Sequence, residues 1–92
     1  MHTEFIAKEE LGNCHFMNAA SSQQEANLAE KLAYGTHLGN AFKGKSIITF
    51  NTDHGLRKVE TTIWAVTENH IQLKGEALIP IQSIISIGFH AS

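Results

Sequence analysis

The sequence has little of two residues that often staple or interrupt small folds: its 92 residues include one cysteine and one proline. A single thiol, Cys14, cannot form an internal disulfide, which excludes the disulfide-stapled class of small secreted domains and favours a reducing compartment. Long apolar runs are missing too, because runs such as residues 63–66 and 78–81 are far too short to cross a bilayer. We therefore expect a soluble, cytoplasmic protein without a membrane partner.

A strong excess of charge is also absent, since seven Lys and Arg stand against nine Asp and Glu, a formal net charge of −2. This balance gives no sequence-wide attraction to nucleic-acid phosphates or anionic membranes, so any such contact would need a local patch. A hydrophobic content of 42% and a charged content of 17% are typical of a folded globular chain. The length predicts one domain.

The first part of the chain divides into an arm and a helix. Residues 1–20 lack a clear periodicity and are interpreted as an N-terminal arm before a single domain over residues 21–92. A capping-box pattern follows, in which the Ser22 hydroxyl can accept from the backbone N–H of Glu25 while the glutamate reaches back. This pattern predicts a helix that begins at about residue 22.

Helical spacing continues through Leu28 and Leu32, which form one apolar stripe. Glycines weaken the second half of this segment. The helix either ends at Gly35, giving residues 22–35, or continues to about residue 42 with its glycines allowing close approach to a neighbouring element.

After residue 44 the apolar pattern changes from helical to alternating, and β-branched residues become frequent. Pro80 has no N–H to donate, so it ends the fourth of five expected strands. Five short strands in so small a domain need closure to avoid exposed edges. We therefore predict a mainly β fold with one N-terminal helix (α+β), in which residues 45–89 form a five-stranded antiparallel barrel. The expected strands are residues 46–50, 56–66, 70–73, 77–79 and 84–89.

The order of these elements resembles the Sm-like fold, bacterial Hfq in particular, over roughly residues 28–89. The closest local similarities are residues 48–56, a strand that leads into a glycine turn, and residues 67–73, a polar turn before the third strand. Residues 77–84 also look like the end of an SH3 domain, where a proline and a 3₁₀ turn join the last two strands. The resemblance implies an SH3-like or Sm-like barrel, and its Sm-like form implies RNA binding by a ring of subunits.

Motifs for catalysis or metal binding are missing. Imidazole and thiolate suit zinc or copper, but no two histidines are spaced as His-x-His or three to four residues apart, and Cys14 is directly followed by His15. No serine lies in a nucleophile-elbow frame, and the glycines match no phosphate loop. We therefore assign no catalytic, cofactor-binding or metal-binding residue. The histidines are His2, His15, His37, His54, His70 and His90.

These observations predict a small non-enzymatic binding or assembly module without a cofactor and of unknown partner. Self-association through edge strands is one form of assembly, for which Leu78, Ile85 and Ile87 supply apolar surface. Two alternatives stay open: Sm-like binding of RNA or single-stranded nucleic acid, and a metal protein or enzyme that uses the histidines.

For the nucleic-acid alternative, several basic residues show some clustering, and pairing of the first two strands is expected to bring Lys45 near Arg57 and Lys58. Such a patch beside Trp64 would combine stacking with phosphate contacts. A solvated polar face is favoured over this alternative because of the net negative charge. Alternation directs Trp64 away from the barrel interior, so the apolar stripe of the helix is expected to cover it, or else it marks an interface. The basic residues are Lys43, Lys45, Arg57, Lys58 and Lys74, and the candidate surface contacts are Arg57, Lys58, Trp64, Asn69, His70 and Gln82.

Overall fold

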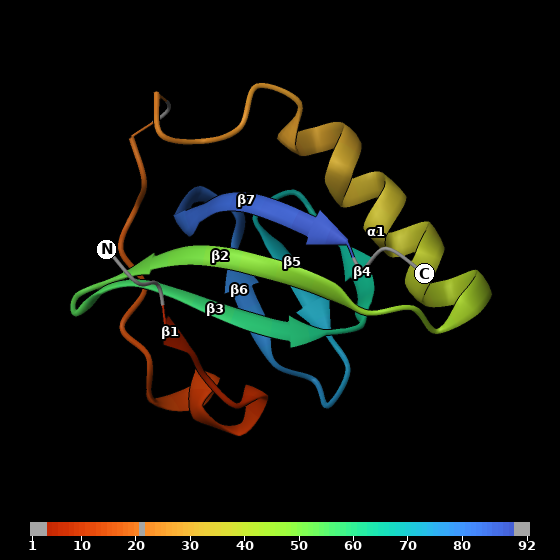
Figure 1. Ribbon diagram of the computed structural model, residues 1–92, viewed down its shortest axis with the longest axis horizontal. Helices are drawn as coiled ribbons and strands as arrows, with labels where there is room; N and C mark the ends of the chain where they lie inside the picture. Colours follow the sequence, from red (N-terminus) through yellow and green to blue (C-terminus); the bar gives the residue numbers. More distant parts are fainter. Residues whose placement is uncertain (1–3, 21, 90–92) are drawn as a thin grey trace.

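A computed structural model describes residues 4–20 and 22–89 (Figure 1). The described chain is mainly β with one α-helix, as the sequence predicts. Its elements are β1 (Glu4–Phe5), the 3₁₀ helix η1 (Lys8–Asn13), α1 (Leu28–Phe42), β2 (Ser46–Thr52), β3 (Gly55–Thr61), β4 (Ile63–Val66), β5 (His70–Leu73), β6 (Leu78–Pro80), the 3₁₀ helix η2 (Ile81–Ser83) and β7 (Ile84–Phe89).

Seven strands of the described residues form two sheets, ordered β1-β3-β2-β7 and β4-β5-β6, and neither sheet closes into a barrel. The prediction of one closed five-stranded barrel is therefore wrong in strand number and closure. The expected strand over residues 56–66 divides at Thr62, where three consecutive residues, Thr61 to Ile63, are buried and break the alternation of a flat strand. Residues of the arm add β1, which pairs in parallel with β3.

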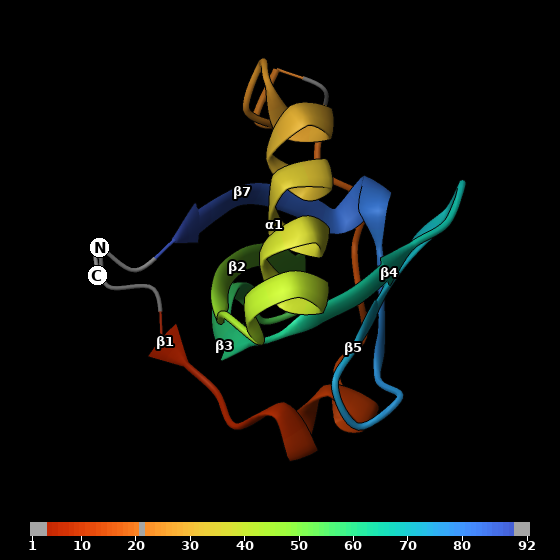
Figure 2. The same ribbon diagram turned by 90° about the vertical axis from the view of Figure 1, so that its right-hand side faces the viewer.

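The core lies between the two sheets and is built from alternate residues of their strands. Ile48 and Phe50 of β2 are completely buried, and so are Ile71 and Leu73 of β5, whose alternating pattern predicts that they face inward. Each such side chain contributes roughly 1.5–3 kcal/mol by leaving water. Helix α1 packs against β4 of one sheet and β7 of the other, so it bridges the two sheets on one side (Figure 2).

Helix α1 begins six residues later than the capping box predicts. The backbone N–H of Glu25 donates to the carbonyl of Ile85 (3.0 Å), and the Gln24 side-chain amide donates to Ile84 (2.8 Å). The capping-box residues therefore lie along the edge of β7. At its other end α1 continues to Phe42, which confirms the longer alternative, and Lys43 ends it in the left-handed conformation (φ 54°).

Close approach at the helix glycines is also confirmed. A Cβ on Gly39 would collide with the carbonyl oxygen of Ile63 and lie 2.9 Å from Thr62 Cγ2. One turn earlier, a Cβ on Gly35 would lie 3.0 Å from Ile63 Cδ1. The backbone of α1 therefore rests directly on the point where β3 passes into β4.

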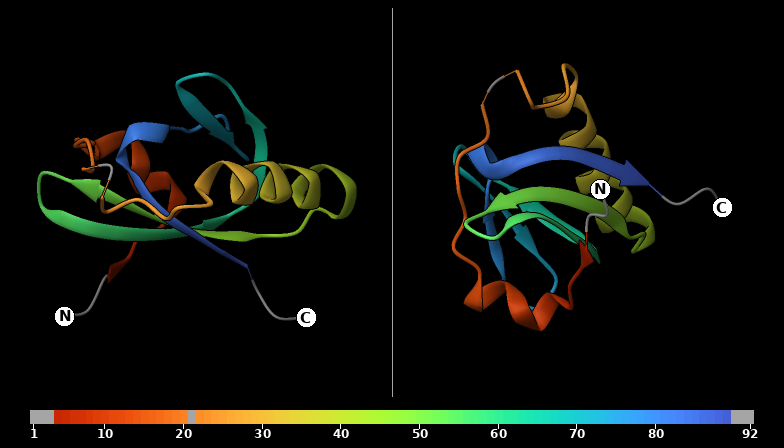
Figure 3. Two further views of the ribbon diagram at one scale, coloured as in Figure 1. Left: turned by 90° about the horizontal axis from the view of Figure 1, so that it is seen from above. Right: turned by 60° about the vertical axis from the view of Figure 1, so that its left-hand side comes forward.

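The arm folds against the sheets along its described length (Figure 3). Leu11 of η1 is buried in the core, and the ring of Phe16 lies 5.5 Å from that of Phe50. The Ala19 N–H then donates to the carbonyl of Gln82 (2.8 Å). Among the described residues, no helix combines the length and the apolar character needed to cross a membrane.

Candidate functional site

A hollow of about 670 Å³ lies where the end of α1, the junction of β3 and β4, and the helix η1 meet. We call it the lysine hollow because four lysines line it together with the tryptophan. Its cationic side chains and its aromatic side chain are Lys8, Lys43, Lys45, Lys74 and Trp64.

Separate segments bring these lysines together. Lys43 and Lys45 flank the reversal between α1 and β2, which is closed by a hydrogen bond from the N–H of Gly44 to the carbonyl of Leu38 (3.2 Å). Lys74 follows β5, and its N–H donates to the carbonyl of Thr62 (2.9 Å), which ties the β5–β6 turn to the start of β4. Lys8 comes from η1 of the arm.

Charge in the lysine hollow has the opposite sign to that of the whole chain. Four of the seven Lys and Arg of the sequence line it, and two acidic residues, Glu9 and Glu60, line it as well. Four positive and two negative groups give a local balance of +2, against −2 for the chain. The hollow is thus a local basic patch of the kind that an anionic ligand needs in a weakly acidic protein.

Trp64, the only tryptophan of the sequence, is 43% exposed on β4 beside buried Ile63. The prediction that it points away from the interior is confirmed. Leu28 and Leu32 of the helix instead join the core, so the prediction that their stripe covers Trp64 is wrong. The helix contributes to the surroundings of Trp64 only through its last turns, where Gly39, Asn40 and the capping Lys43 line the same hollow.

The structure divides the predicted basic cluster. Lys43, Lys45 and Lys74 lie around Trp64, but Arg57 and Lys58 do not line this hollow. In the β2–β3 ladder Ser46 pairs with Thr61 and Thr49 pairs with Lys58, so Lys45 and Lys58 are four residues apart along the strands, or roughly 13 Å. The expectation that strand pairing brings them together is wrong. Lys58 instead places its Nζ 5.7 Å from the centroid of the Phe5 ring.

The other candidate contacts lie at the opposite end of β4. His70 exchanges hydrogen bonds with Thr67, and the carbonyl of Asn69 accepts from the N–H of Ile81 (2.9 Å). Gln82 accepts from Ala19 through its carbonyl. These residues therefore form a turn, together with η2, that is separate from Trp64.

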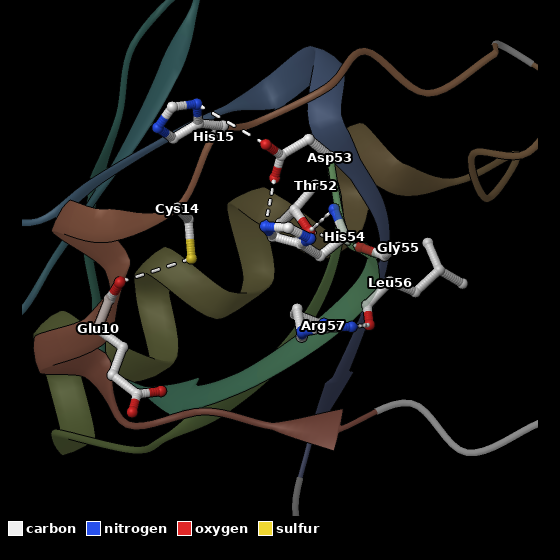
Figure 4. Close-up of polar contacts among 9 residues, drawn as sticks. All are labelled: Glu10, Cys14, His15, Thr52, Asp53, His54, Gly55, Leu56 and Arg57. Atoms are coloured by element: carbon white, nitrogen blue, oxygen red, sulfur yellow. Dashed lines mark hydrogen bonds and ion pairs between the residues drawn. The ribbon is translucent and has the colours of Figure 1, made fainter.

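A second cluster surrounds Cys14 in a pocket of about 300 Å³, which we call the cysteine pocket (Figure 4). The thiol lies 3.5 Å from the carbonyl of Glu10, and Arg57 of β3 lines the same pocket. Burial raises the pKa of the Cys14 thiol, the Glu10 carboxylate adds to the rise, and Arg57 opposes it. The thiol is therefore protonated at neutral pH, and a protonated thiol is a poor nucleophile and a poor metal ligand.

Two histidines lie beside the cysteine pocket on either side of Asp53. His15 Nδ1 and His54 Nε2 are 3.8 and 3.7 Å from the Asp53 carboxylate, and both imidazoles are about 80% exposed. Within residues 4–20 and 22–89, no three His, Cys, Asp or Glu side chains are grouped so as to hold a metal ion. His2 and His90 lie outside the described residues.

Sequence reasoning missed Lys8 and Asn40 of the lysine hollow. Lys8 lies in a segment without periodicity, and the packing of the arm, through the pairing of β1 with β3 and the burial of Leu11, brings it close. Asn40 lies on a helix whose extension beyond Gly35 was one of two alternatives. Comparisons of the chain with protein-family models, with curated proteins and with solved structures found no match.

Proposed function

We propose that the protein is a small non-enzymatic binding module of the SH3-like or Sm-like class, and that its ligand is an anion held in the lysine hollow. One observation carries the proposal: a chain of net charge −2 places four of its seven cationic side chains around its only tryptophan. Like charges repel one another, so an anion bound among the four lysines would lower their mutual repulsion.

The order of the elements supports the SH3-like or Sm-like class. A helix precedes a hairpin, the hairpin's second strand continues through Thr62 into the other sheet, and η2 joins the last two strands. A strand that bends from one sheet into the next, followed by a 3₁₀ turn before the final strand, is the pattern on which the resemblance rests.

Assembly through strand edges is the less favoured form of the proposal. The Ile84 and Ile85 carbonyls on the outer edge of β7 already accept from Gln24 and Glu25. A second chain that paired there would have to displace this segment first. Leu78, on edge strand β6, is 51% exposed. Edge-to-edge contact between two chains therefore stays a prediction, which light scattering tests by measuring the mass of the protein in solution.

Titration of the isotopically labelled protein with tripolyphosphate at low salt tests the proposal. Amide resonances of Lys43, Lys45, Trp64 and Lys74 are expected to shift, and those of Lys58 are expected to stay in place. The double variant K45Q/K74Q should lose most of the response. K31Q is the matched control, because Lys31 forms an ion pair with Glu25 (2.9 Å) outside the hollow. An absence of shifts, or shifts centred on Lys58, would refute the proposal.

A further inference from the structure

We infer that the lysine hollow binds carboxylates of a second copy of this chain, in a two-fold symmetric dimer formed by the face between α1 and β4. This inference rests on the proposed function, because it names the anion that the hollow holds. It goes further by assigning a second site on the same face, an apolar groove that receives Trp64 of the other copy.

The apolar groove has a volume of about 410 Å³ and lies between the first turns of α1, the end of β4 and η2. Its one polar lining residue, Gln24, donates its side-chain amide to the carbonyls of Ile81 (3.0 Å) and Ile84 (2.8 Å). This amide nitrogen therefore has no donor left for a ligand, and the groove suits an apolar side chain. Its aliphatic lining residues are Leu28, Ala29, Leu32, Ala33, Val66 and Ile81.

The apolar groove and the lysine hollow lie at opposite ends of one face. Ala33 lies four residues after Ala29, and Asn40 lies seven after Ala33, so helical periodicity places all three on one side of α1. The two alanines line the groove and Asn40 lines the hollow. On β4, Val66 lines the groove and Trp64 lines the hollow, two residues or roughly 7 Å apart. We call this surface the α1–β4 face.

The middle of the α1–β4 face is apolar surface left in water. Trp64 and Val66 are 43% and 39% exposed. The register of β4 against β5 shifts between Ile63 and Ala65, which places a β-bulge at Trp64, and bulges commonly re-aim a side chain. A tryptophan at the centre of an exposed apolar patch is a frequent anchor of protein–protein interfaces.

The rim of the groove carries charge of the opposite sign to that of the hollow. Glu30 lies three residues before Ala33 and is its neighbour on the surface of α1. Glu68 lies in the turn after β4, which is held beside the groove because the carbonyl of Asn69 accepts from the N–H of Ile81 (2.9 Å). Both glutamates are exposed, and neither forms an ion pair with another residue that the structure describes. The α1–β4 face is therefore acidic at the groove and basic at the hollow.

This arrangement is complementary to itself. A two-fold axis that crosses the face beside Trp64 turns the second copy end over end, so that each hollow meets the groove of the other copy. The two α1 helices then run antiparallel and bring Lys43 towards Glu30 of the second copy. On the strand side of the face, Lys74 approaches Glu68 of the second copy, and Trp64 enters its groove. The contact closes with two copies and uses no strand edge.

Sedimentation equilibrium of the full chain tests the inference. At low salt the protein is expected to have twice the mass of the chain, and the dimer fraction should fall as salt rises. Tripolyphosphate competes for the hollow and should also shift the dimer towards monomer. Trp64 is the only tryptophan, so dilution should move the fluorescence emission to longer wavelength as the indole returns to water.

Charge exchange tests the pairing of hollow and rim. K74E and E68K should each weaken dimerisation on the order of 10-fold, because two-fold symmetry places each new pair of like charges in the interface twice. The double variant K74E/E68K should regain most of the affinity, since both pairs are re-formed with exchanged signs. K58E is the matched control and should leave dimerisation unchanged, because Lys58 lines neither the hollow nor the groove.

Two further variants test the apolar contact. W64A removes the central anchor and should weaken dimerisation on the order of 100-fold. A33L changes no charge but fills the groove at an exposed position of α1, so it should weaken dimerisation as well. The test therefore does not depend on the folding of W64A.

The outcomes separate this inference from the proposed function. A monomer at the highest soluble concentration would overturn the inference; the proposed function would stand if tripolyphosphate still shifted the hollow amides and would fall with it if no shifts appeared. A dimer that L78K dissociates and K74E does not would use the edge of β6 and overturn the inference. A monomer whose Ala29 and Ala33 amides shift with a lysine-rich amphipathic peptide would give the groove a different partner and overturn it too.

Discussion

The lysine hollow and the cysteine pocket lie on either side of the same 3₁₀ helix, but they handle charge differently. Glu9 of η1 lines the hollow and Glu10 lines the pocket. In the pocket two carboxylates, Glu10 and Asp53, stand against the single guanidinium of Arg57. The hollow keeps an excess of positive groups beside an exposed indole. Of the two pockets with polar linings, the one with an excess of positive groups is the stronger candidate for an anionic ligand.

The largest expected effect, on the free energy of unfolding, comes from a substitution in α1 where the helix lines the lysine hollow. G39A should destabilise the protein by about 3 kcal/mol, because the new methyl group would meet the carbonyl oxygen of Ile63. G12A is the matched control in η1, since a Cβ there has no neighbour within 4 Å. Urea unfolding measures both variants, and equal stability of the two would contradict the close contact of α1 with β4.

The next largest effect is expected from L11A, which tests whether η1 holds the arm in place beside the lysine hollow and the cysteine pocket. Leu11 of η1 is buried in the core, and the same helix gives residues to both the hollow and the pocket. L11A should cost about 2 kcal/mol in unfolding free energy and should increase amide exchange throughout residues 4–20. Increased exchange limited to Leu11 itself would show that the arm is held by its other contacts.

A smaller effect concerns the reactivity of Cys14. Because its pKa lies above the ordinary value, alkylation by iodoacetamide at neutral pH should be slower than in the unfolded chain. E10Q removes a negative charge, lowers the pKa and should speed the reaction roughly twofold, whereas R57Q should slow it by a similar factor. Rates that change in the same direction in both variants would contradict this electrostatic account.

The smallest expected effect on stability comes from breaking the ion pair between Lys31 and Glu25, which lies outside the lysine hollow and the cysteine pocket. K31Q should change the unfolding free energy by only about 0.5 kcal/mol, since Lys31 and Glu25 remain partly exposed to solvent. Chemical denaturation at low and high salt measures this value. A loss above about 2 kcal/mol would show that this pair anchors the residues before α1, and K31Q would then be unsuitable as the binding control.

Local alternation was enough to predict that Ile71 and Leu73 face inward and that Trp64 faces outward, but it placed Thr62, which is buried, on the outward face. The start of α1 was not predictable in this way, because the capping-box residues form their hydrogen bonds with β7, about 60 residues further along the chain. The prediction of a closed barrel was wrong because the alternating pattern over residues 56–66 contains no signal for the break at Thr62.

The candidate site was predictable to the extent that its residues follow known strands. Lys45 was expected beside Trp64 and does line the hollow with it, whereas Lys43 and Lys74 were noted as basic residues without a place beside Trp64. Arg57 and Lys58 were grouped with them wrongly, because proximity depends on the register of the β2–β3 ladder and not on strand pairing alone. The place of Lys8 in the hollow could not be predicted, because it depends on the tertiary contact of the arm with the sheets.

The hydrogen bonds that Gln24 and Glu25 make to the edge of β7 also bear on how the protein behaves at high concentration. An unpaired strand edge rich in isoleucine is a template for fibril growth, and β7 contains Ile84, Ile85 and Ile87. The segment before α1 occupies the first part of this edge with its own donors. Aggregation is therefore expected to begin with detachment of this segment, well before the two sheets separate.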